Sequence, residues 1–289
     1  MGEYNLLSKG LTTCEGCPME LIARHAIETL GEKTVTMTPP SCSAILTGGG
    51  DETGWGVPSV QTMLMSLPAY ASGVSEALKI QGKNEVNIMG FAGDGGTFDI
   101  GFQSLSGAIE RGHKAIFICY NNEAYMNTGN QRSSATTLGA YTKTTPTGKK
   151  EQSKNIDFML LHTPLAYQAT ASVSNIKDLR RKIAKAATKD GPSFIHVLAP
   201  CHAGWKMPPR KMVEVGRLAV QSGIWPLFER EDGKITINSK PKDYELIREY
   251  IGLQGRFDRI DEETIVKIIE NAKIKYRTLE SLSKLEELA

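Results

Sequence analysis

The strongest constraint on the fold is a pair of hydrophobic segments joined by a glycine-rich turn and a predicted helix. Residues 85–91 and 115–120 have the composition of buried strands, and residues 98–111 have that of a helix. The turn Gly93-Asp94-Gly95-Gly96-Thr97 follows the first strand directly. This order of strand, turn, helix and strand predicts a right-handed βαβ unit with two parallel strands.

Further segments extend this pattern over most of the chain. Additional strands are expected at residues 33–37, 165–171 and 193–198, and helices at residues 67–81 and 176–188. Strands that alternate with helices predict an α/β fold, with a mostly parallel sheet and helices on both faces. Residues 38–56 are rich in Pro, Ser and Gly, so we expect a loop with little regular structure there.

The alternation of strands and helices ends after Cys201. A small hairpin is expected around Asp232-Gly233, and residues 261–287 have the spacing of a charged amphipathic helix. Such a helix would pack equally well on its own chain or on a partner. The sequence therefore predicts one domain at residues 1–220 and a C-terminal extension, made of the small hairpin and the helical tail, at residues 221–289.

Composition excludes several classes of protein. The formal net charge is +2, and no concentrated basic face indicates binding to nucleic acid. No hydrophobic run approaches the roughly 20 residues that span a bilayer, and the N-terminus lacks a signal segment. We therefore expect a cytoplasmic protein without a membrane or nucleic-acid partner. A run of lysines is expected to lie in a solvated loop; its members are Lys143, Lys149, Lys150 and Lys154.

The glycine-rich turn has the composition of a phosphate-binding site. Glycines let the backbone approach a diphosphate, and the following helix offers unpaired N–H groups at its N-terminus. Asp94 would repel phosphate oxygens unless a divalent cation lay between them, which is a common arrangement for Mg²⁺. Asn122, 28 positions later (122 − 94 = 28), ends the next strand and should lie at the same edge of the sheet. Taken alone, however, a Gly-Asp-Gly turn is more often a turn without a ligand.

A longer block makes the sequence resemble a known family. Gly-Asp-Gly followed at this distance by an asparagine is similar to the signature of thiamine-pyrophosphate enzymes. The segment from Gly93 to Gly129 resembles the β subunit of pyruvate:ferredoxin oxidoreductase, a 2-oxoacid:ferredoxin oxidoreductase. The similarity covers about residues 8–220 and includes Asn122-Glu123-Ala124-Tyr125-Met126-Asn127-Thr128-Gly129, Gln131-Arg132-Ser133-Ser134 and Thr144-Thr145-Pro146.

The resemblance implies a thiamine-diphosphate-binding fold and roles for individual residues. It implies that Mg²⁺ is bound by Asp94, the Asn122 side chain and the Ala124 carbonyl. It also implies that Asn127 lies beside the thiazolium ring and the substrate, as the catalytic residue of this chain. The residues implied to line the diphosphate are Gly93, Gly95, Gly96 and Thr97, and Cys42 is implied to lie near the cofactor.

The cysteines suggest a metal or redox centre. Cys14 and Cys17 form a Cys-x-x-Cys pair, which alone could serve zinc, a redox disulfide or an iron–sulfur cluster. The resemblance adds Cys42 and Cys201, the latter before Gly204-Trp205, and implies one [4Fe–4S] cluster bound by all four. Structural zinc is the alternative for these cysteines. The fifth cysteine, Cys119, is expected in the hydrophobic core of its strand.

The implied activity is the thiamine-pyrophosphate-dependent oxidative decarboxylation of a 2-oxoacid, with pyruvate and coenzyme A as the leading substrates. Electrons would pass to ferredoxin through the cluster, and the chain would act only with an α subunit and ferredoxin-like or γ subunits. Another 2-oxoacid, such as oxalate, phenylglyoxylate or 2-oxoisovalerate, is the first alternative. A non-redox decarboxylase with structural zinc is the second, and a metal-binding subunit with a vestigial turn is the third. Departures from the family pattern at Ser41 and His202 weaken the assignment of a substrate but not that of the cluster.

Three further polar residues are candidates for a functional role. Glu123 is expected to be structural or an ion-pair partner, rather than the group that activates the cofactor. His113 is expected to be a helix-cap or surface histidine. His202 is expected to be a packing residue, with a hydrogen bond to a cluster sulfur as the alternative.

Overall fold

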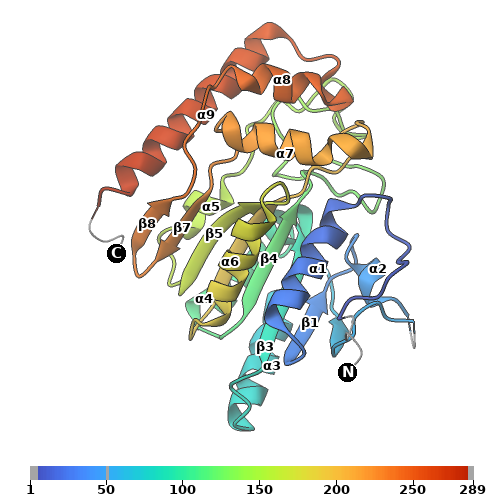
Figure 1. Ribbon diagram of the computed structural model, residues 1–289, viewed down its shortest axis with the longest axis vertical. Coiled ribbons are helices and arrows are strands. Elements are labelled where there is room, and N and C mark those ends of the chain that lie inside the picture. The colour runs from blue at the N-terminus through green and yellow to red at the C-terminus, as the bar shows by residue number, and fades with distance from the viewer. Residues whose placement is uncertain (1–5, 50–51, 286–289) are drawn as a thin grey trace.

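The computed structural model of the chain describes residues 6–49 and 52–285. Within them, the strands form one eight-stranded sheet in the order β2-β1-β3-β4-β6-β5-β7-β8 (Figure 1). The strands from β2 to β5 in this order pair in parallel, whereas β7 and β8 join antiparallel at one edge. The expected mostly parallel sheet is therefore confirmed. The strands are β1 (Thr34–Thr38), β2 (Ser59–Gln61), β3 (Asn87–Gly93), β4 (Ile116–Asn121), β5 (Tyr167–Ser172), β6 (Ser193–Leu198), β7 (Phe228–Glu231) and β8 (Lys234–Ile237).

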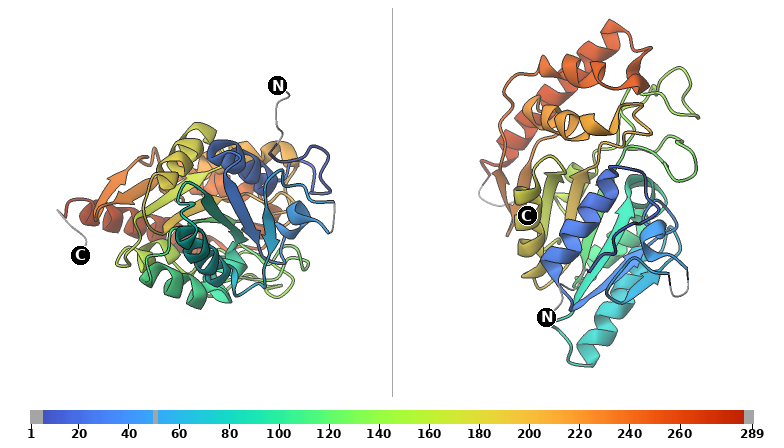
Figure 2. Two further views of the ribbon diagram at one scale, coloured as in Figure 1. Left: turned by 90° about the horizontal axis from the view of Figure 1, so that it is seen from below. Right: turned by 45° about the vertical axis from the view of Figure 1, so that its right-hand side comes forward.

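Two hydrophobic layers cover the two faces of the sheet. Side chains alternate along each strand, so that Phe91 and Ile118 belong to one buried cluster while Ala92 and Phe117 belong to the other. Helices from different parts of the chain supply the rest of each layer, as the two views of Figure 2 show. On the first face these helices are α1 (Pro18–Leu30) and α6 (Ile176–Ala187), and on the second they are α3 (Leu67–Ile80) and α4 (Phe102–Glu110).

The helical segment after β3 differs from the prediction. Instead of one α-helix over residues 98–111, a π-helix, η1 (Gly95–Asp99), precedes α4. A Cβ atom at Gly101 would lie 2.0 Å from the Gly96 carbonyl oxygen, so the junction between the two helices accepts only glycine. Single π-turns are frequent at functional sites. The irregular turn begins directly beyond the end of β3.

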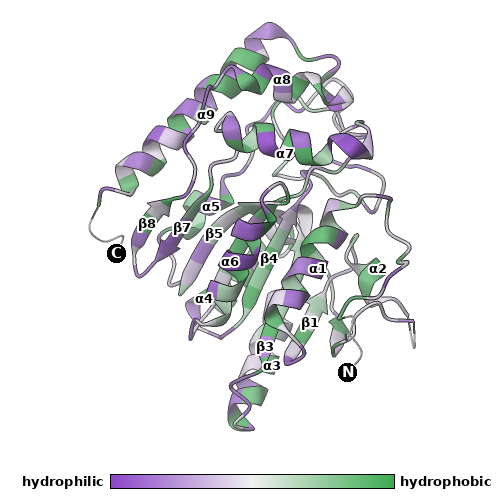
Figure 3. Cartoon of the chain, in the orientation of Figure 1, coloured by the Kyte–Doolittle hydropathy of each residue, from purple (hydrophilic) through white to green (hydrophobic). Residues whose placement is uncertain are grey.

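The C-terminal extension builds onto the main sheet. The predicted hairpin is present as β7 and β8, and β7 pairs with β5. α9 (Glu262–Leu282) is the predicted terminal helix, and it packs on its own chain. Hydrophilic and hydrophobic bands alternate along it in Figure 3. Its buried residues are Ile268, Ile269, Ala272, Tyr276 and Leu279. The boundary between residues 220 and 221 stays a prediction, although both parts share one sheet.

Some shorter elements were not expected. They are α2 (Ala44–Thr47) inside the predicted loop, α5 (Ile156–Leu160), α7 (Met212–Gln221) and α8 (Leu246–Gly252), together with the single-turn 3-10 helices η2 (Pro209–Lys211) and η3 (Gly255–Phe257). Residues 50–51 of that loop and residues 286–287 of the predicted tail lie outside the described residues. Within the described ranges, every helix is too short or too polar to cross a membrane.

Candidate functional site

The glycine-rich turn and the end of β4 line one pocket at the carboxyl edge of the sheet. Gly93 ends β3 opposite Tyr120 of the neighbouring strand, so both chain segments leave the sheet at the same level. Ligands bind at this edge in open α/β sheets. The pocket has a volume of about 60 Å³. Of the residues predicted for the cofactor and metal, it is lined by Cys42, Gly93, Gly95, Gly96, Asn122, Ala124 and Asn127.

Asp94 and Thr97, the other two residues predicted for the diphosphate and Mg²⁺, do not line this pocket. Asp94 is completely buried, and its carboxylate accepts hydrogen bonds from the Ser133 hydroxyl and from the Asn122 backbone N–H, the latter at 3.2 Å. Burial raises the pKa of Asp94 to about 7, and the nearby Glu123 adds to the rise. The Thr97 hydroxyl donates to the Gly93 carbonyl at 2.8 Å within its own helical turn. A buried carboxylate without a cation is costly, and a divalent cation at its oxygens would remove that cost.

A close contact explains why the turn needs glycine. A Cβ atom at Gly95 would lie 2.4 Å from the Tyr125 ring. The Tyr125 hydroxyl in turn donates to the Gly95 carbonyl at 3.1 Å. The phenol ring therefore packs directly on the turn, and it links the segment after β4 to the start of η1.

The segment from Asn122 to Ala124 has an unusual backbone. Glu123 has a φ of 62°, in the left-handed region that non-glycine residues rarely adopt. Its N–H donates to the Asn121 side-chain oxygen at 2.9 Å, and its carbonyl accepts from the Thr136 hydroxyl at 2.6 Å. The Asn122 side-chain oxygen accepts from the Ala124 N–H at 3.3 Å. These bonds hold the Asn122 and Ala124 oxygens on one tight turn beside the pocket.

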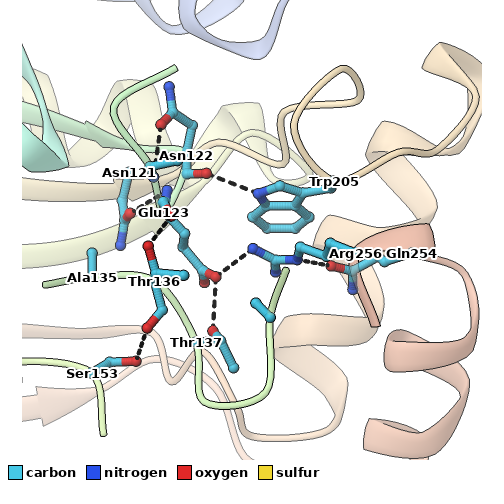
Figure 4. A network of polar contacts seen from close by, with 12 residues as sticks. Asn121, Asn122, Glu123, Ala135, Thr136, Thr137, Ser153, Trp205, Gln254 and Arg256 are labelled. Atoms are coloured by element: carbon cyan, nitrogen blue, oxygen red, sulfur yellow. Dashed lines mark hydrogen bonds and ion pairs between the residues drawn. The ribbon is translucent and has the colours of Figure 1, made fainter. Parts of the chain in front are cut away.

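The Glu123 side chain points towards Arg256 and Thr137, within a buried network (Figure 4). Its carboxylate forms an ion pair with Arg256 at 2.6 Å and accepts from the Thr137 hydroxyl at 2.7 Å. The Arg256 guanidinium stacks on the Trp205 ring, 3.7 Å from its centroid. The Trp205 indole N–H donates to the Asn122 carbonyl at 2.8 Å. The expectation of an ion pair for Glu123 is confirmed. Sequence reasoning missed Arg256, because no local pattern marks a partner 133 positions away.

Four cysteines, Cys14, Cys17, Cys42 and Cys201, are linked by the effects of their charges on one another. Burial is the main cause that raises the pKa of Cys17 to about 11 and that of Cys42 to about 12. The charges of Cys14 and Cys201 raise both pKa values further, and that of Cys17 also raises the pKa of Cys42. Within the described residues, no three Cys, His, Asp or Glu side chains are grouped as a single metal ion requires. Cys42 also lines the pocket, so the four cysteines adjoin the pocket through this residue.

The remaining candidates lie elsewhere. Cys119 is buried in β4, as expected, and half-buried His113 lies 3.7 Å from the Glu76 carboxylate. The His202 Nε2 atom is buried without a hydrogen-bond partner among the described residues. The prediction of a solvated lysine loop was wrong for Lys149. This lysine is buried because its ammonium donates to the Ser134 and Thr136 carbonyls, at 3.0 and 2.7 Å.

A second, larger cavity of about 210 Å³ lies on the other side of Glu123. It contains a buried pair in which His196 and Asp157 are joined at 2.9 Å. Asn121 contacts the other ring nitrogen of His196 at 3.0 Å, so this pair is linked to the segment after β4. No local sequence pattern marks either residue, since both are single polar residues within hydrophobic segments.

Comparisons with known proteins bear on this site. Residues 53–197, which include the glycine turn and the segment after β4, match the family model "Thiamine pyrophosphate enzyme, C-terminal TPP binding domain". The chain is 43% identical to "Pyruvate synthase subunit PorB" of Methanothermobacter thermautotrophicus, over 93% of this chain and 95% of that protein. The chain belongs to the 2-oxoacid:ferredoxin oxidoreductase family, as a β-type subunit.

A second relative is named after a different substrate. "Ketoisovalerate oxidoreductase subunit VorB" of Pyrococcus furiosus is also 43% identical, over 89% of this chain and 86% of that protein. Among solved structures, a 2-oxoglutarate:ferredoxin oxidoreductase from Magnetococcus marinus, with 2-oxoglutarate, coenzyme A and succinyl-CoA bound, superposes with a TM-score of 0.64. It shares 19% sequence identity and covers 93% of this chain and 96% of that one. At that identity the likeness shows a common fold.

Proposed function

We propose that this chain binds thiamine pyrophosphate with Mg²⁺ and one [4Fe–4S] cluster, and that with partner subunits it oxidatively decarboxylates a 2-oxoacid. The observation that carries the proposal is the pocket at the carboxyl edge of the sheet. There the predicted cofactor residues meet Cys42, a member of the four-cysteine group. A cofactor that releases electrons and a centre that accepts them would therefore be neighbours.

The residues present fit a Mg²⁺ diphosphate. Asp94, the Asn122 side chain and the Ala124 carbonyl offer the oxygen ligands that Mg²⁺ prefers, and a bound cation would stabilise the buried Asp94 carboxylate. Gly93, Gly95 and Gly96 would line the diphosphate. Bound thiamine pyrophosphate supplies an electron sink for loss of CO₂ from a 2-oxoacid. Asn127, which lines the same pocket, would orient the substrate by hydrogen bonds.

We propose a cluster rather than a single zinc ion for the four cysteines, because oxidation of a 2-oxoacid beside Cys42 needs an electron acceptor. The charges of Cys14, Cys17 and Cys201 all act on Cys42. A cluster binds each thiolate to a separate iron and lowers the pKa of the thiols that burial has raised. The cluster supplies a one-electron acceptor from which electrons would pass to ferredoxin.

The active site would be completed by a partner. A pocket of about 60 Å³ is far smaller than the roughly 300–1,000 Å³ that ligand sites commonly need, so most of the cofactor would lie between subunits. An α subunit and ferredoxin-like or γ subunits are the proposed partners. Pyruvate with coenzyme A is the first candidate substrate pair, and 2-oxoisovalerate is the next, because relatives with both substrate names are equally similar. A cytoplasmic location also stays a prediction.

The test is anaerobic visible absorption and EPR of the purified complex, before and after addition of pyruvate and coenzyme A. We expect a broad iron–sulfur band that bleaches with substrate, together with the EPR signal of a reduced cluster. Parallel additions of 2-oxoisovalerate and 2-oxoglutarate would rank the substrates. A colourless complex that contains zinc would overturn the redox proposal and favour the non-redox decarboxylase.

A further inference from the structure

The C-terminal extension reaches the proposed metal site through one buried arginine. Arg256 lies in the short helix η3 and is 3% exposed, and its partner Glu123 is 7% exposed. The guanidinium binds the Glu123 carboxylate at 2.6 Å and stacks on Trp205, whose indole N–H binds the Asn122 carbonyl at 2.8 Å. Arg256 therefore acts on two consecutive residues of the segment that carries the proposed metal ligands (Figure 4).

The segment needs such support. A non-glycine residue in the left-handed region is strained and persists only where its surroundings fix it. Glu123 is that residue, with a φ of 62°. Its side chain is fixed by Arg256 and by the Thr137 hydroxyl. Release of the carboxylate would let the backbone relax, and the Asn122 and Ala124 oxygens would then turn away from each other.

Stability alone does not account for the pair. Replacement of a buried ion pair by hydrophobic residues of similar size often leaves a protein equally or more stable. Groups that hold metal ligands in place from behind, by contrast, commonly contribute a factor of about 10–100 to metal affinity. The position of Arg256, directly behind a strained turn with two proposed oxygen ligands, matches the second role.

We propose that Arg256 is a positioning residue for the Mg²⁺-binding segment 122–124, acting through Glu123 and Trp205. The proposal rests on the proposed function, because it assumes that this segment binds the cation of the thiamine pyrophosphate complex. It gives the C-terminal extension a part in cofactor binding, although the extension contributes none of the proposed ligands.

The test is Mn²⁺ binding, followed by the loss of the free Mn²⁺ EPR signal. The assembled complex, stripped of cofactor and divalent metal, is titrated with Mn²⁺ in the presence of thiamine pyrophosphate. We expect Arg256→Gln to weaken Mn²⁺ binding about 10–100-fold, and Arg256→Lys, which keeps the charge, to recover part of the loss. The matched control is Arg248→Gln. It replaces an exposed arginine of the same extension that contacts Glu245 and Glu262. This change should alter the Mn²⁺ affinity by less than about 2-fold.

A second variant distinguishes a positioning role of Arg256 from a folding defect in Arg256→Gln. Trp205→Phe keeps an aromatic ring but lacks the indole N–H that donates to Asn122, so it should also weaken Mn²⁺ binding in a complex that assembles. Wild-type affinity in Arg256→Gln, or in Trp205→Phe if Arg256→Gln does not assemble, would overturn the positioning role. Failure of the wild-type complex itself to bind Mn²⁺ with thiamine pyrophosphate would instead overturn the proposed function.

Discussion

Two buried glutamates, Glu123 and Glu229, each pair with an arginine, yet they stabilise different kinds of structure. Glu229 lies in the regular strand β7, between β5 and β8, and its carboxylate accepts from Arg181 at 2.7 Å and from the Tyr167 hydroxyl at 2.7 Å. Burial opposes its charge, but hydrogen bonds from Arg181 and Tyr167 hold the pKa of Glu229 down to about 2. Glu123 lies in a strained turn and is paired with a residue far along the chain. One pair joins a regular strand of the sheet to a covering helix, and the other fixes a turn that the backbone alone would not adopt.

The difference suggests where the chain gives up stability for function. Around Glu229 the neighbours are basic side chains of one helix, α6, and the partly exposed Lys185 also contacts the carboxylate at 3.5 Å. Around Asp94, near Glu123, the described residues offer a hydroxyl and an N–H but no cation. The charge of Glu229 is thus neutralised within the chain, whereas the described residues place no cation beside the Asp94 carboxylate.

The largest effect is expected at Asp94. Asp94→Asn keeps the shape of the side chain but removes the charge that would bind Mg²⁺. We therefore expect kcat/KM for 2-oxoacid oxidation to fall by about 1,000-fold or more. This fall corresponds to a loss of about 4 kcal/mol in transition-state stabilisation. The thermal midpoint of the complex should not fall, because the change removes a buried and uncompensated carboxyl. Steady-state assays and a melting curve measure both. Activity within ten-fold of wild type would show that Asp94 is not a metal ligand.

The next effect is expected where the Glu123 pair is broken. Arg256→Met leaves a buried carboxylate without its partner and should destabilise the chain by about 3–5 kcal/mol. Arg256→Met combined with Glu123→Gln removes the stranded charge and should recover at least half of the loss in thermal midpoint. If the double variant melts no higher than the single variant, the stranded charge was not the cause.

A smaller effect is expected in strand β7. Glu229→Gln should lower stability by about 2 kcal/mol at neutral pH, because hydrogen bonds to a charged group are lost. The pKa of Glu229 is depressed from 4.5 to about 2, so the wild-type advantage is present above pH 4.5 and is lost as the pH falls towards 2. Melting curves of both proteins from pH 7 downwards measure this window. A gap that stays constant below pH 4.5 would contradict the assigned pKa.

The smallest effect is expected at an exposed pair. Arg248 contacts Glu245 and Glu262 on the surface of the extension, where solvent and salt weaken ion pairs. Arg248→Gln should therefore leave the thermal midpoint unchanged within error at 0.15 M salt. A large shift would mean that this face of the extension is covered in the complex.

The same contrast explains how far the sequence could predict the structure. The sheet and the pocket follow from local patterns: hydrophobic strands at residues 85–91 and 115–120, a glycine turn between them, and Asn122 at the end of the next strand. Burial of Lys149 and the Glu123–Arg256 pair depend on side chains brought together from distant segments, and no periodicity encodes them. The π-turn at Gly95–Asp99 depends on contacts of Gly95 with Tyr125 and of Gly101 with Gly96, which likewise arise only in the folded chain.

The most direct test of the account is a crystal structure of the complex with thiamine pyrophosphate and Mn²⁺, with anomalous scattering recorded for manganese. If the proposed metal site is correct, one manganese peak will be bonded to the Asp94 carboxylate, the Asn122 side-chain oxygen and the Ala124 carbonyl. A manganese site elsewhere, with diphosphate density away from Gly93–Gly96, would contradict it.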